Sequence, residues 1–161
     1  MKVLNLMAHH VRTCAPEDSL NTAAHIMWVG DFGCVPVVDE DSRVVGMITD
    51  RDICMAAYTR GVSLHALSVK SAMAKEVVCC APEDDILVAE KLMRKNEIRR
   101  LPVVDALGKL VGIISIDNIV RQALREHLMG QPRSISDLEV TETLATICTP
   151  RITVSVERAA A

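Results

Sequence analysis

The sequence predicts an α+β fold built from two similar halves that share one compact module. Two observations favour this fold class. The chain repeats itself without a gap at an offset of 66 residues, and 19 of the 51 positions paired between Val3–Ile53 and Val69–Ile119 are identical. Each copy also contains short β-rich runs and amphipathic helical segments in the same order. Self-similarity over this length indicates two copies of one supersecondary unit with a common core.

Each copy begins with a predicted short strand, Val11–Cys14 or Val77–Cys80, that runs into a Pro-containing turn. The acidic residues of the repeated "CAPED" block are expected to open the next helix, because they favour the positive end of its dipole. Apolar residues at helical spacing mark the face of this helix that packs on the core. They are Leu20, Ala23, Ala24 and Met27 in the first copy, and Ile86, Ala89, Leu92 and Met93 in the second.

Two further β-rich runs and a second helix complete each copy. The runs "VPVVD" and "RVVGMIT", and later "LPVVD" and "KLVGIIS", are separated by short polar loops and therefore predict hairpins. The second helices are expected at about Asp50–Thr59 and Ile116–Met129. The pattern β-α-β-β-α, stated twice, predicts two small sheets whose helices cover each other.

The repeat divides the chain into residues 1–62, residues 63–130 and an extension, residues 131–161, with "RGVSLHAL" as the link between the copies. In the extension, "SISDLEVTETLATIC" predicts a helix with Leu138, Leu144, Ile147 and Cys148 along one side, and "RITVSVE" predicts a strand. The extension is expected to pack either on the module or on a partner subunit.

Composition argues against two classes of partner. The formal net charge is −3, and Trp28, Phe32 and Tyr58 are the only aromatic residues, so neither a basic patch nor a base-stacking platform for nucleic acid is expected. No apolar run approaches the roughly 20 residues that cross a bilayer. The N-terminus lacks the apolar stretch and cleavage site of a leader. We therefore expect no membrane partner and a cytoplasmic location.

Cysteines, histidines and short motifs give no catalytic or metal site. The six cysteines form no CxxC pair and have no zinc-type spacing with histidine, so they are interpreted as small buried hydrophobes. Cys79 and Cys80 are the one candidate redox pair. The adjacent His9 and His10 would point apart on a helix, which disfavours a shared metal. GxGxxG, Walker A, HExxH and GxSxG motifs are absent, so no catalytic residue and no required cofactor is predicted.

The polar turn before each second helix permits two interpretations. Thr49 and Asp52, like Ser115 and Asn118, have the spacing of a capping box, in which the two side chains satisfy main-chain N–H groups at the helix start. The same helix start presents free N–H groups to phosphate. Asp52 can accept from ribose hydroxyls while Arg51 bridges phosphate oxygens. These residues alone leave cap and ligand site equally open.

The repeated unit, with its "PVVD" strand and its closing "GMITDRD" or "GIISIDN" turn, resembles the cystathionine-β-synthase (CBS) domain, and the tandem pair resembles a Bateman module. The resemblance runs from Val3 to about Met129. It implies a disc with a cleft between its halves and two sites there for AMP, ADP, ATP or another adenosyl compound such as S-adenosylmethionine. It further implies a non-catalytic regulatory sensor that forms a homodimer and acts on an effector protein that the sequence does not identify.

The resemblance also implies the ligand-binding residues, position by position. The first site would comprise Thr13, Ala15, Val35, Pro36, Thr49, Arg51 and Asp52, and the second Cys79, Ala81, Arg99, Arg100, Leu101, Pro102, Ser115, Asp117 and Asn118. Asn118 in place of Asp, and Cys79 in place of Thr, predict unequal sites with the first as the better ribose binder. Two other functions stay open, namely a ligand-free dimerisation scaffold and a thiol redox switch at Cys79 and Cys80.

Overall fold

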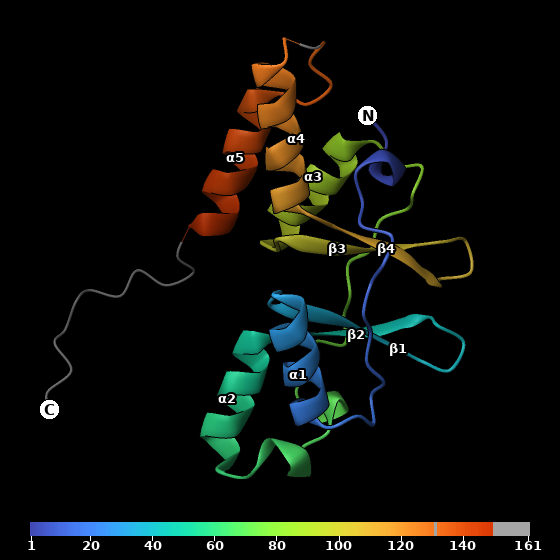
Figure 1. Ribbon diagram of the computed structural model, residues 1–161, viewed down its shortest axis with the longest axis vertical. Helices are drawn as coiled ribbons and strands as arrows, with labels where there is room; N and C mark the ends of the chain where they lie inside the picture. The colour runs from blue at the N-terminus through green and yellow to red at the C-terminus, as the bar shows by residue number, and fades with distance from the viewer. Residues whose placement is uncertain (131, 150–161) are drawn as a thin grey trace, which may run out of the picture.

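The computed structural model describes residues 1–130 and 132–149 and contains two similar halves and one added helix (Figure 1). The first half consists of α1 (Leu20–Gly30), β1 (Cys34–Val38), β2 (Val44–Thr49) and α2 (Asp50–Arg60). The second half consists of α3 (Ile86–Asn96), β3 (Arg100–Val104), β4 (Leu110–Ser115) and α4 (Ile116–Leu128), and α5 (Asp137–Cys148) follows it. Short 3-10 turns lie at Val3–Asn5, Leu64–Ala66 and Val69–Ser71. The predicted α+β class is confirmed.

Both predicted hairpins are present, and they have the same register. In the β1–β2 sheet Cys34 pairs with Thr49, and in the β3–β4 sheet Arg100 pairs with Ser115. Each hairpin therefore places the first residue of one strand beside the polar residue that ends the other. The repeat in sequence is reproduced as a repeat in strand geometry.

The first strand predicted for each copy is shortened in the structure to a single paired residue. Only Cys14 and Cys80 pair, each through a single parallel bridge to β1 or β3. The extended run cannot continue because the Pro-containing turn begins at the next residue. There the Ala15 N–H donates to the Asp18 carboxylate at 2.8 Å, and the Ala81 N–H donates to Asp84 at the same distance.

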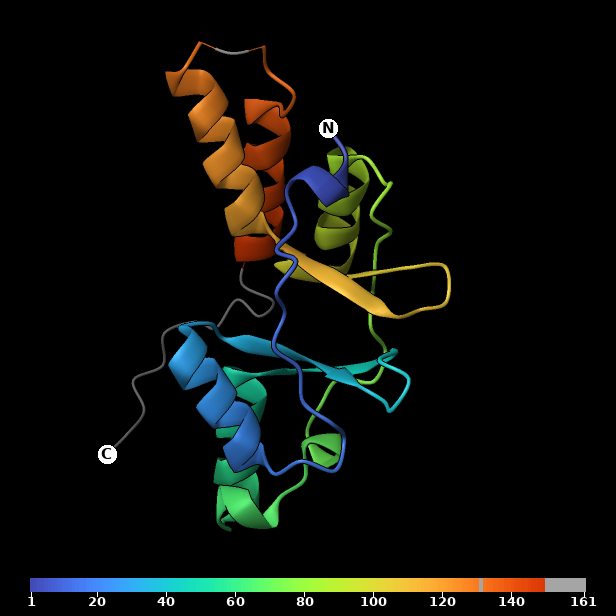
Figure 2. The same cartoon turned by 45° about the vertical axis from the view of Figure 1, so that its right-hand side comes forward.

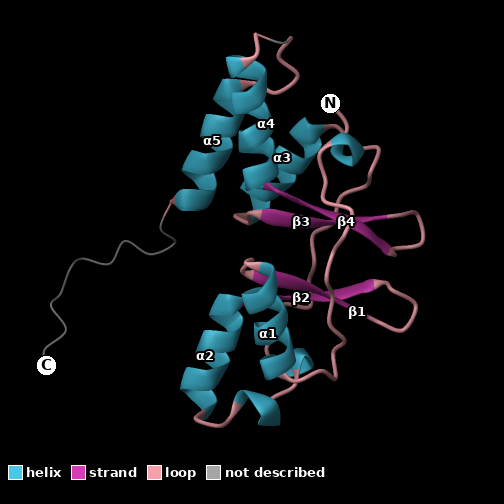
Figure 3. Cartoon of the chain, viewed as in Figure 1, coloured by secondary structure: helices cyan, strands magenta, loops and turns pink. Residues whose placement is uncertain are grey.

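The two sheets lie at the centre of the molecule and the helices lie on its outer sides (Figure 3). The expectation that the helices of the two halves cover each other is therefore wrong. Each helix pair instead packs its apolar stripe on its own sheet, so that the sheets of the two halves face one another. The hairpin loops are joined by main-chain hydrogen bonds, from Val44 N–H to the Gly108 carbonyl at 3.3 Å and from Leu110 N–H to the Ser42 carbonyl at 3.0 Å.

The first helix of each copy begins later than predicted. Ser19 caps α1 and Asp85 caps α3, and neither helix has an acidic residue in its first turn. The expectation that the "PED" acids open these helices is wrong because Asp18 and Asp84 close the preceding turn instead. The predicted second helices are confirmed as α2 and α4.

The predicted core stripes of α1 and α3 are confirmed. Leu20, Ala23, Met27, Ile86, Ala89 and Met93 are buried, and Ala24 and Leu92 are partly buried. The segment that precedes each half packs in the core of the other half. Val3 packs in the core of the second half and Val69 in that of the first, and their N–H groups donate to Asp84 and Asp18 carbonyls at 2.9 and 2.8 Å. This exchange interlocks the halves.

The helix predicted in the extension is present as α5, which packs against α3 and α4 (Figure 2). Its buried face consists of Val140, Thr143 and Ile147, whereas the predicted Leu138 and Cys148 are exposed and Leu144 is partly buried. The predicted stripe is thus partly wrong, because the surface of α3 and α4 on which α5 packs determines which face of α5 is buried. The strand predicted at 151–157 lies outside the described residues.

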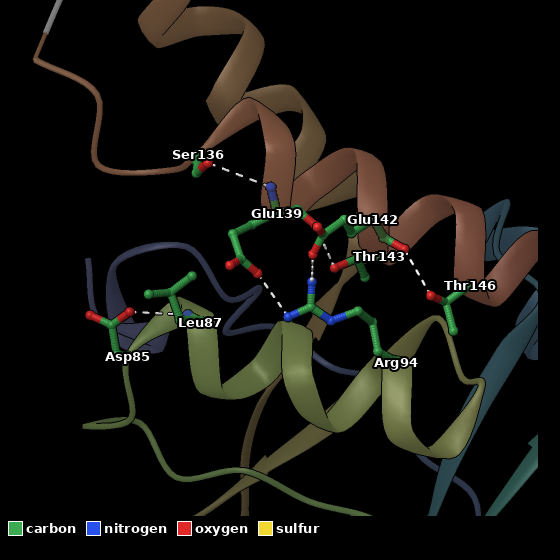
Figure 4. A network of polar contacts seen from close by, with 8 residues as sticks. All are labelled: Asp85, Leu87, Arg94, Ser136, Glu139, Glu142, Thr143 and Thr146. Atoms are coloured by element: carbon green, nitrogen blue, oxygen red, sulfur yellow. Dashed lines mark hydrogen bonds and ion pairs between the residues drawn. The ribbon is translucent and has the colours of Figure 1, made fainter.

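Polar contacts fix α5 on the second half. The Arg94 guanidinium of α3 pairs with Glu139 at 2.7 Å and with Glu142 at 3.1 Å (Figure 4). The buried Glu126 carboxylate of α4 accepts from the main-chain N–H groups of Ser134 and Ile135 and from the Ser134 hydroxyl, and so holds the connection that leads into α5. Hydrogen bonds from Ser134 and Gln122 lower the pKa of Glu126 to about 2.

Candidate functional site

The polar turns at the starts of α2 and α4 form two complete capping boxes. The Thr49 hydroxyl accepts from the Asp52 N–H at 3.2 Å, and Asp52 Oδ2 accepts from the Thr49 N–H at 2.9 Å and from its hydroxyl at 2.6 Å. Ser115 and Asn118 repeat these contacts at 3.3, 3.0 and 2.6 Å. The capping interpretation is confirmed, and it leaves several polar atoms for a ligand.

The atom left over by the cap differs between the two turns. Asp52 uses only Oδ2 in its cap, so Oδ1 remains as an acceptor without a hydrogen bond to any described residue. Asn118 uses Oδ1 for the same two donors, so its Nδ2 donor remains without a hydrogen bond to any described residue. The first turn therefore offers an acceptor to a ligand hydroxyl, and the second offers a donor.

The predicted base walls lie on β1 and β3. Val35 and Leu101 are fully buried in the core clusters of their halves. Since successive strand residues point to opposite faces, Pro36 and Pro102 lie on the faces turned away from those cores, toward the other half. The two prolines face the other half, but both are themselves buried.

One arginine of the second half, Arg100, acts electrostatically on the first half. Arg99 is exposed and its carbonyl accepts from the Ile116 N–H at 2.9 Å, whereas Arg100 is half-buried. Burial raises the pKa of the Cys34 thiol, and the Arg100 guanidinium opposes that rise. The Arg100 charge therefore acts across the boundary, beside the strand residue that pairs with Thr49. This electrostatic effect between the halves was not predicted from the sequence.

The remaining predicted residues lie at the edges of this region. Ala15 and Ala81 commit their N–H groups to the turns that follow them. Arg51 and Asp117 are exposed in the first turns of α2 and α4. Half-buried Thr13 lines a hollow of about 150 Å³ with His9, Val11, Val38, Ser42, Leu110, Val111 and Gly112.

A second hollow, of about 520 Å³, lies between α1 and α2 and extends to Gly33 and Asp50 at the strand ends. Thr13 is the only predicted site residue that lines either hollow. The structure therefore brings the two polar turns and Arg100 to neighbouring strand ends, while the hollow at Thr13 opens farther along the hairpins. The larger hollow was missed by the sequence analysis, although the exposed Trp28 in its lining is the single tryptophan of the chain.

The cysteine pair is poorly suited to redox chemistry. Burial, with smaller contributions from Asp84 and Cys79, raises the pKa of Cys80 to about 12, and burial also raises the pKa of Cys79. Because the thiolate is the reactive form, both thiols are held in their unreactive state near neutral pH. Within residues 1–130 and 132–149, no three His, Cys, Asp or Glu side chains gather in a way that could hold a metal, and no helix has the length and hydropathy to cross a membrane.

Sequence comparison assigns both halves to one family. The model of the CBS domain matches residues 3–58 and again residues 69–125. Over 147 residues the chain is 31% identical to an uncharacterized 17.7 kDa protein of Acidianus ambivalens, covering 91% of this chain and 88% of that protein. It is 33% identical to the inosine-5'-monophosphate dehydrogenase of Methanocaldococcus jannaschii over 70% of this chain, but it spans only 21% of that enzyme's length.

Solved structures with the same fold include two that hold adenosyl compounds. The CBS domain pair of protein MJ0100, in complex with 5'-methylthioadenosine and S-adenosyl-L-methionine, matches with a TM-score of 0.69 and 25% identity over 76% of this chain and 94% of that chain. CBSX2 in complex with AMP matches with a TM-score of 0.69 and 26% identity over 78% of this chain and 98% of that chain.

Proposed function

Because this chain belongs to the CBS domain family, we propose that it is a non-catalytic sensor of an adenosyl compound bound between its two halves. The observation that carries this proposal is the pair of capped helix starts, one with a free Asp52 oxygen and with the Arg100 charge nearby. An adenosyl ligand supplies ribose hydroxyls that can donate to the Asp52 oxygen. If the ligand is a nucleotide, it also supplies phosphate for Arg100. The complexes of MJ0100 and CBSX2 support this class of ligand.

In the proposed first site, Asp52 Oδ1 accepts from the ribose hydroxyls while Thr49 keeps the carboxylate oriented. Arg51, Arg99 and Arg100 are the candidate phosphate partners, because a guanidinium can bridge two phosphate oxygens. Pro36 forms the wall for the base, and Val35 holds its strand in place from the core side. Thr13 and Ala15 border the base at the strand edge.

The proposed second site uses the equivalent positions with different chemistry. Pro102 and Leu101 take the places of Pro36 and Val35, and Cys79 and Ala81 take those of Thr13 and Ala15. The Asn118 Nδ2 donor, beside Ser115 and Asp117, favours a ligand atom that accepts. We therefore expect the first site to bind ribose more tightly than the second.

Regulation would follow from differential binding. A ligand shifts a protein between two arrangements only to the extent that it binds one of them better. We propose that residues 1–62 and 63–130 are the two units that bind the ligand and that residues 131–161 are an appended element. We also propose that the protein is a homodimer and that it regulates an effector protein. The cytoplasm is the proposed location, since it contains adenine nucleotides and keeps cysteines such as the six free ones here reduced.

Thermal unfolding with AMP, ADP, ATP and S-adenosylmethionine tests the proposal. A ligand at one hundred times its dissociation constant stabilises the folded state by about 2.7 kcal/mol, which raises the melting temperature of a chain of this size by roughly 5–10 °C. Asp52→Asn is the decisive variant. It retains an Oδ1 acceptor for the cap and replaces the free acceptor by a donor, as Asn118 already does.

Asp52→Asn should melt close to the wild type without ligand and lose most of the ligand-induced gain. Asn118→Asp should increase that gain, and Glu76→Gln, which changes an exposed carboxylate elsewhere, should leave it unchanged. An equal gain in wild type and Asp52→Asn would remove Asp52 from the site. No gain with any of the four compounds would refute the sensor and favour the dimerisation scaffold.

A further inference from the structure

The contact between α3 and α5 contains one cation and three carboxyl groups. Arg94 of α3 reaches between Glu139 and Glu142 of α5 and pairs with both, at 2.7 and 3.1 Å (Figure 4). Glu90 lies one helical turn before Arg94 on α3, is completely buried, and has no hydrogen-bond partner for either oxygen among the described residues. The guanidinium of Arg94 therefore serves α5, while the carboxyl group nearest to it on α3 is left without a partner.

A buried carboxyl group without a partner is far more stable in its neutral form, because the charged form has lost its water and gained nothing in return. Burial accordingly raises the pKa of Glu90 to about 7; Glu139 and Asp85 add to the rise, and Arg94 opposes it. With α5 in place, Glu90 is thus protonated at pH 5 and mostly ionised at pH 8. In water it would be largely ionised at both.

The other charged groups on the elements around α3 already have partners. The Glu126 carboxylate of α4 accepts from the connection that leads into α5, and Asp137 of α5 pairs with an arginine of that connection. The N-terminal ammonium group pairs with Asp85 at 3.2 Å. Arg100, the first residue of β3, acts on a thiol of the first half. Arg94 is therefore the cation best placed to stabilise an ionised Glu90.

We propose that α5 is a pH-dependent cover of the second half, which stays on α3 while Glu90 is protonated and leaves when Glu90 loses its proton and Arg94 turns to it. Arg94 can make this change without leaving α3, because a Glu and an Arg four residues later are neighbours on a helix surface. The proton passes to water. α5 then loses both ion pairs with α3 and keeps only the contacts of its buried face, which consists of Val140, Thr143 and Ile147.

Glu126 keeps the released helix attached. Its pKa of about 2 leaves it ionised from pH 5 to pH 8, so its hydrogen bonds from Ser134 and Ile135 do not change in this range. Release therefore begins after Ile135. Once away from its support, α5 is a helix of 12 residues, which is marginal in water, so its main-chain hydrogen bonds open as well. The pH thus controls how often the outer faces of α3 and α4 are uncovered.

Hydrogen exchange of the full chain, followed by mass spectrometry at pH 5 and pH 8, tests the proposal because it reports the opening of each segment separately. With a pKa of 4.5 for Glu90 in the released form and about 7 in the docked form, the opening equilibrium of α5 should rise by up to about 70-fold between the two pH values. This rise is measured on peptides from α5 after correction for the intrinsic pH dependence of exchange. Peptides from α3, the helix left behind, are the internal reference and should open less often than α5 at both pH values.

Three variants sharpen the test. Glu90→Gln cannot ionise, so its α5 should open equally often at pH 5 and pH 8, whereas Glu76→Gln removes an exposed carboxylate elsewhere and should keep the wild-type rise. In Glu139→Gln with Glu142→Gln, Arg94 is free to pair with Glu90 while α5 is docked. This double variant should therefore open more often than the wild type at pH 5 and show a much smaller rise to pH 8. Circular dichroism verifies that each variant is folded at both pH values.

The outcomes are separable. A rise in the opening of α5 that is absent from Glu90→Gln and reduced in the double variant supports the proposal. No rise in the wild type overturns it. So does an α5 that opens only as often as α3 does, because the helix would then leave only when the second half unfolds. A rise that persists in Glu90→Gln would assign the titration to another group, and a double variant with the full wild-type rise would show that Arg94 does not change partners; either result overturns the proposal.

Discussion

Replacing Glu90 by glutamine should remove most of the pH dependence of folding stability between pH 5 and pH 8. The Glu90 side chain on α3 is completely buried, and neither of its oxygens has a hydrogen-bond partner among the described residues. Burial raises the pKa of Glu90 from 4.5 to about 7; Glu139 and Asp85 act in the same direction, and Arg94 opposes them. The folded protein therefore binds this proton more tightly than the unfolded chain does.

The magnitude follows from that difference in proton affinity. One pKa unit corresponds to about 1.4 kcal/mol, so the raised pKa of Glu90 is equivalent to about 3 kcal/mol of stability. This stability is fully present below pH 4.5, where the carboxyl is protonated in both states, and is lost as the pH rises through about 7. From pH 5 to pH 8 the free energy of unfolding should fall by about 2–3 kcal/mol.

Urea denaturation at the two pH values, followed by circular dichroism, measures this fall. Glu90→Gln is neutral at both, so its stability should change little between them and should exceed that of the wild type at pH 8 by about 3 kcal/mol. Glu76→Gln removes an exposed carboxylate and should keep the wild-type slope. A wild type equally stable at pH 5 and pH 8, or the wild-type slope in Glu90→Gln, would refute the reasoning.

Three further predictions concern other parts of the molecule. Glu126→Gln should destabilise the protein by about 2 kcal/mol in urea at pH 7, because an amide nitrogen would replace one of the two oxygens that accept from Gln122, Ser134 and Ile135; the contribution of the carboxylate is fully present above pH 4.5 and should fade only as the pH falls toward 2. Gly112→Ala should lower the melting temperature, because its Cβ would lie 2.6 Å from a Met7 sulfur and 3.0 Å from a main-chain oxygen; an unchanged melting temperature would contradict this. Iodoacetamide at pH 8 should label exposed Cys54 before buried Cys80 in mass spectrometry, and equal rates would show that Cys80 is open to solvent.

The elements that the sequence predicted well are those determined by local periodicity. The stripes of α1 and α3 and both hairpins follow from spacing within a dozen residues, and the repeat supplied each prediction twice. Elements whose packing depends on residues far away in the sequence were predicted less well. On α5, the exposed Leu138 and the buried Thr143 reverse the simple hydrophobic expectation, because the position of Arg94 and the core of the second half select the buried face.

The candidate site shows the same division. The spacing of Thr49 and Asp52 predicted their contact, and the capping box is confirmed, because both residues lie in one helical turn. Arg100 is different: its charge acts on Cys34 in the other half, and this proximity depends on how the two sheets face each other. Glu90 had a sequence signal that was missed, since it lies four residues from Ile86 on the apolar face of α3.

The differences between the two copies explain why a repeated unit is not a redundant one. At equivalent positions the first half has Ala24 and Trp28 where the second has Glu90 and Arg94. The first pair lines an open groove, whereas the second pair lies where α3 packs against α5. Asp52 and Asn118 make the same cap but leave an acceptor and a donor, respectively. Since backbone geometry and capping are shared, a few side chains on this common framework distinguish the halves. The second half is committed to internal packing on its outer side, and the first half presents both an outer groove and the stronger candidate ribose site.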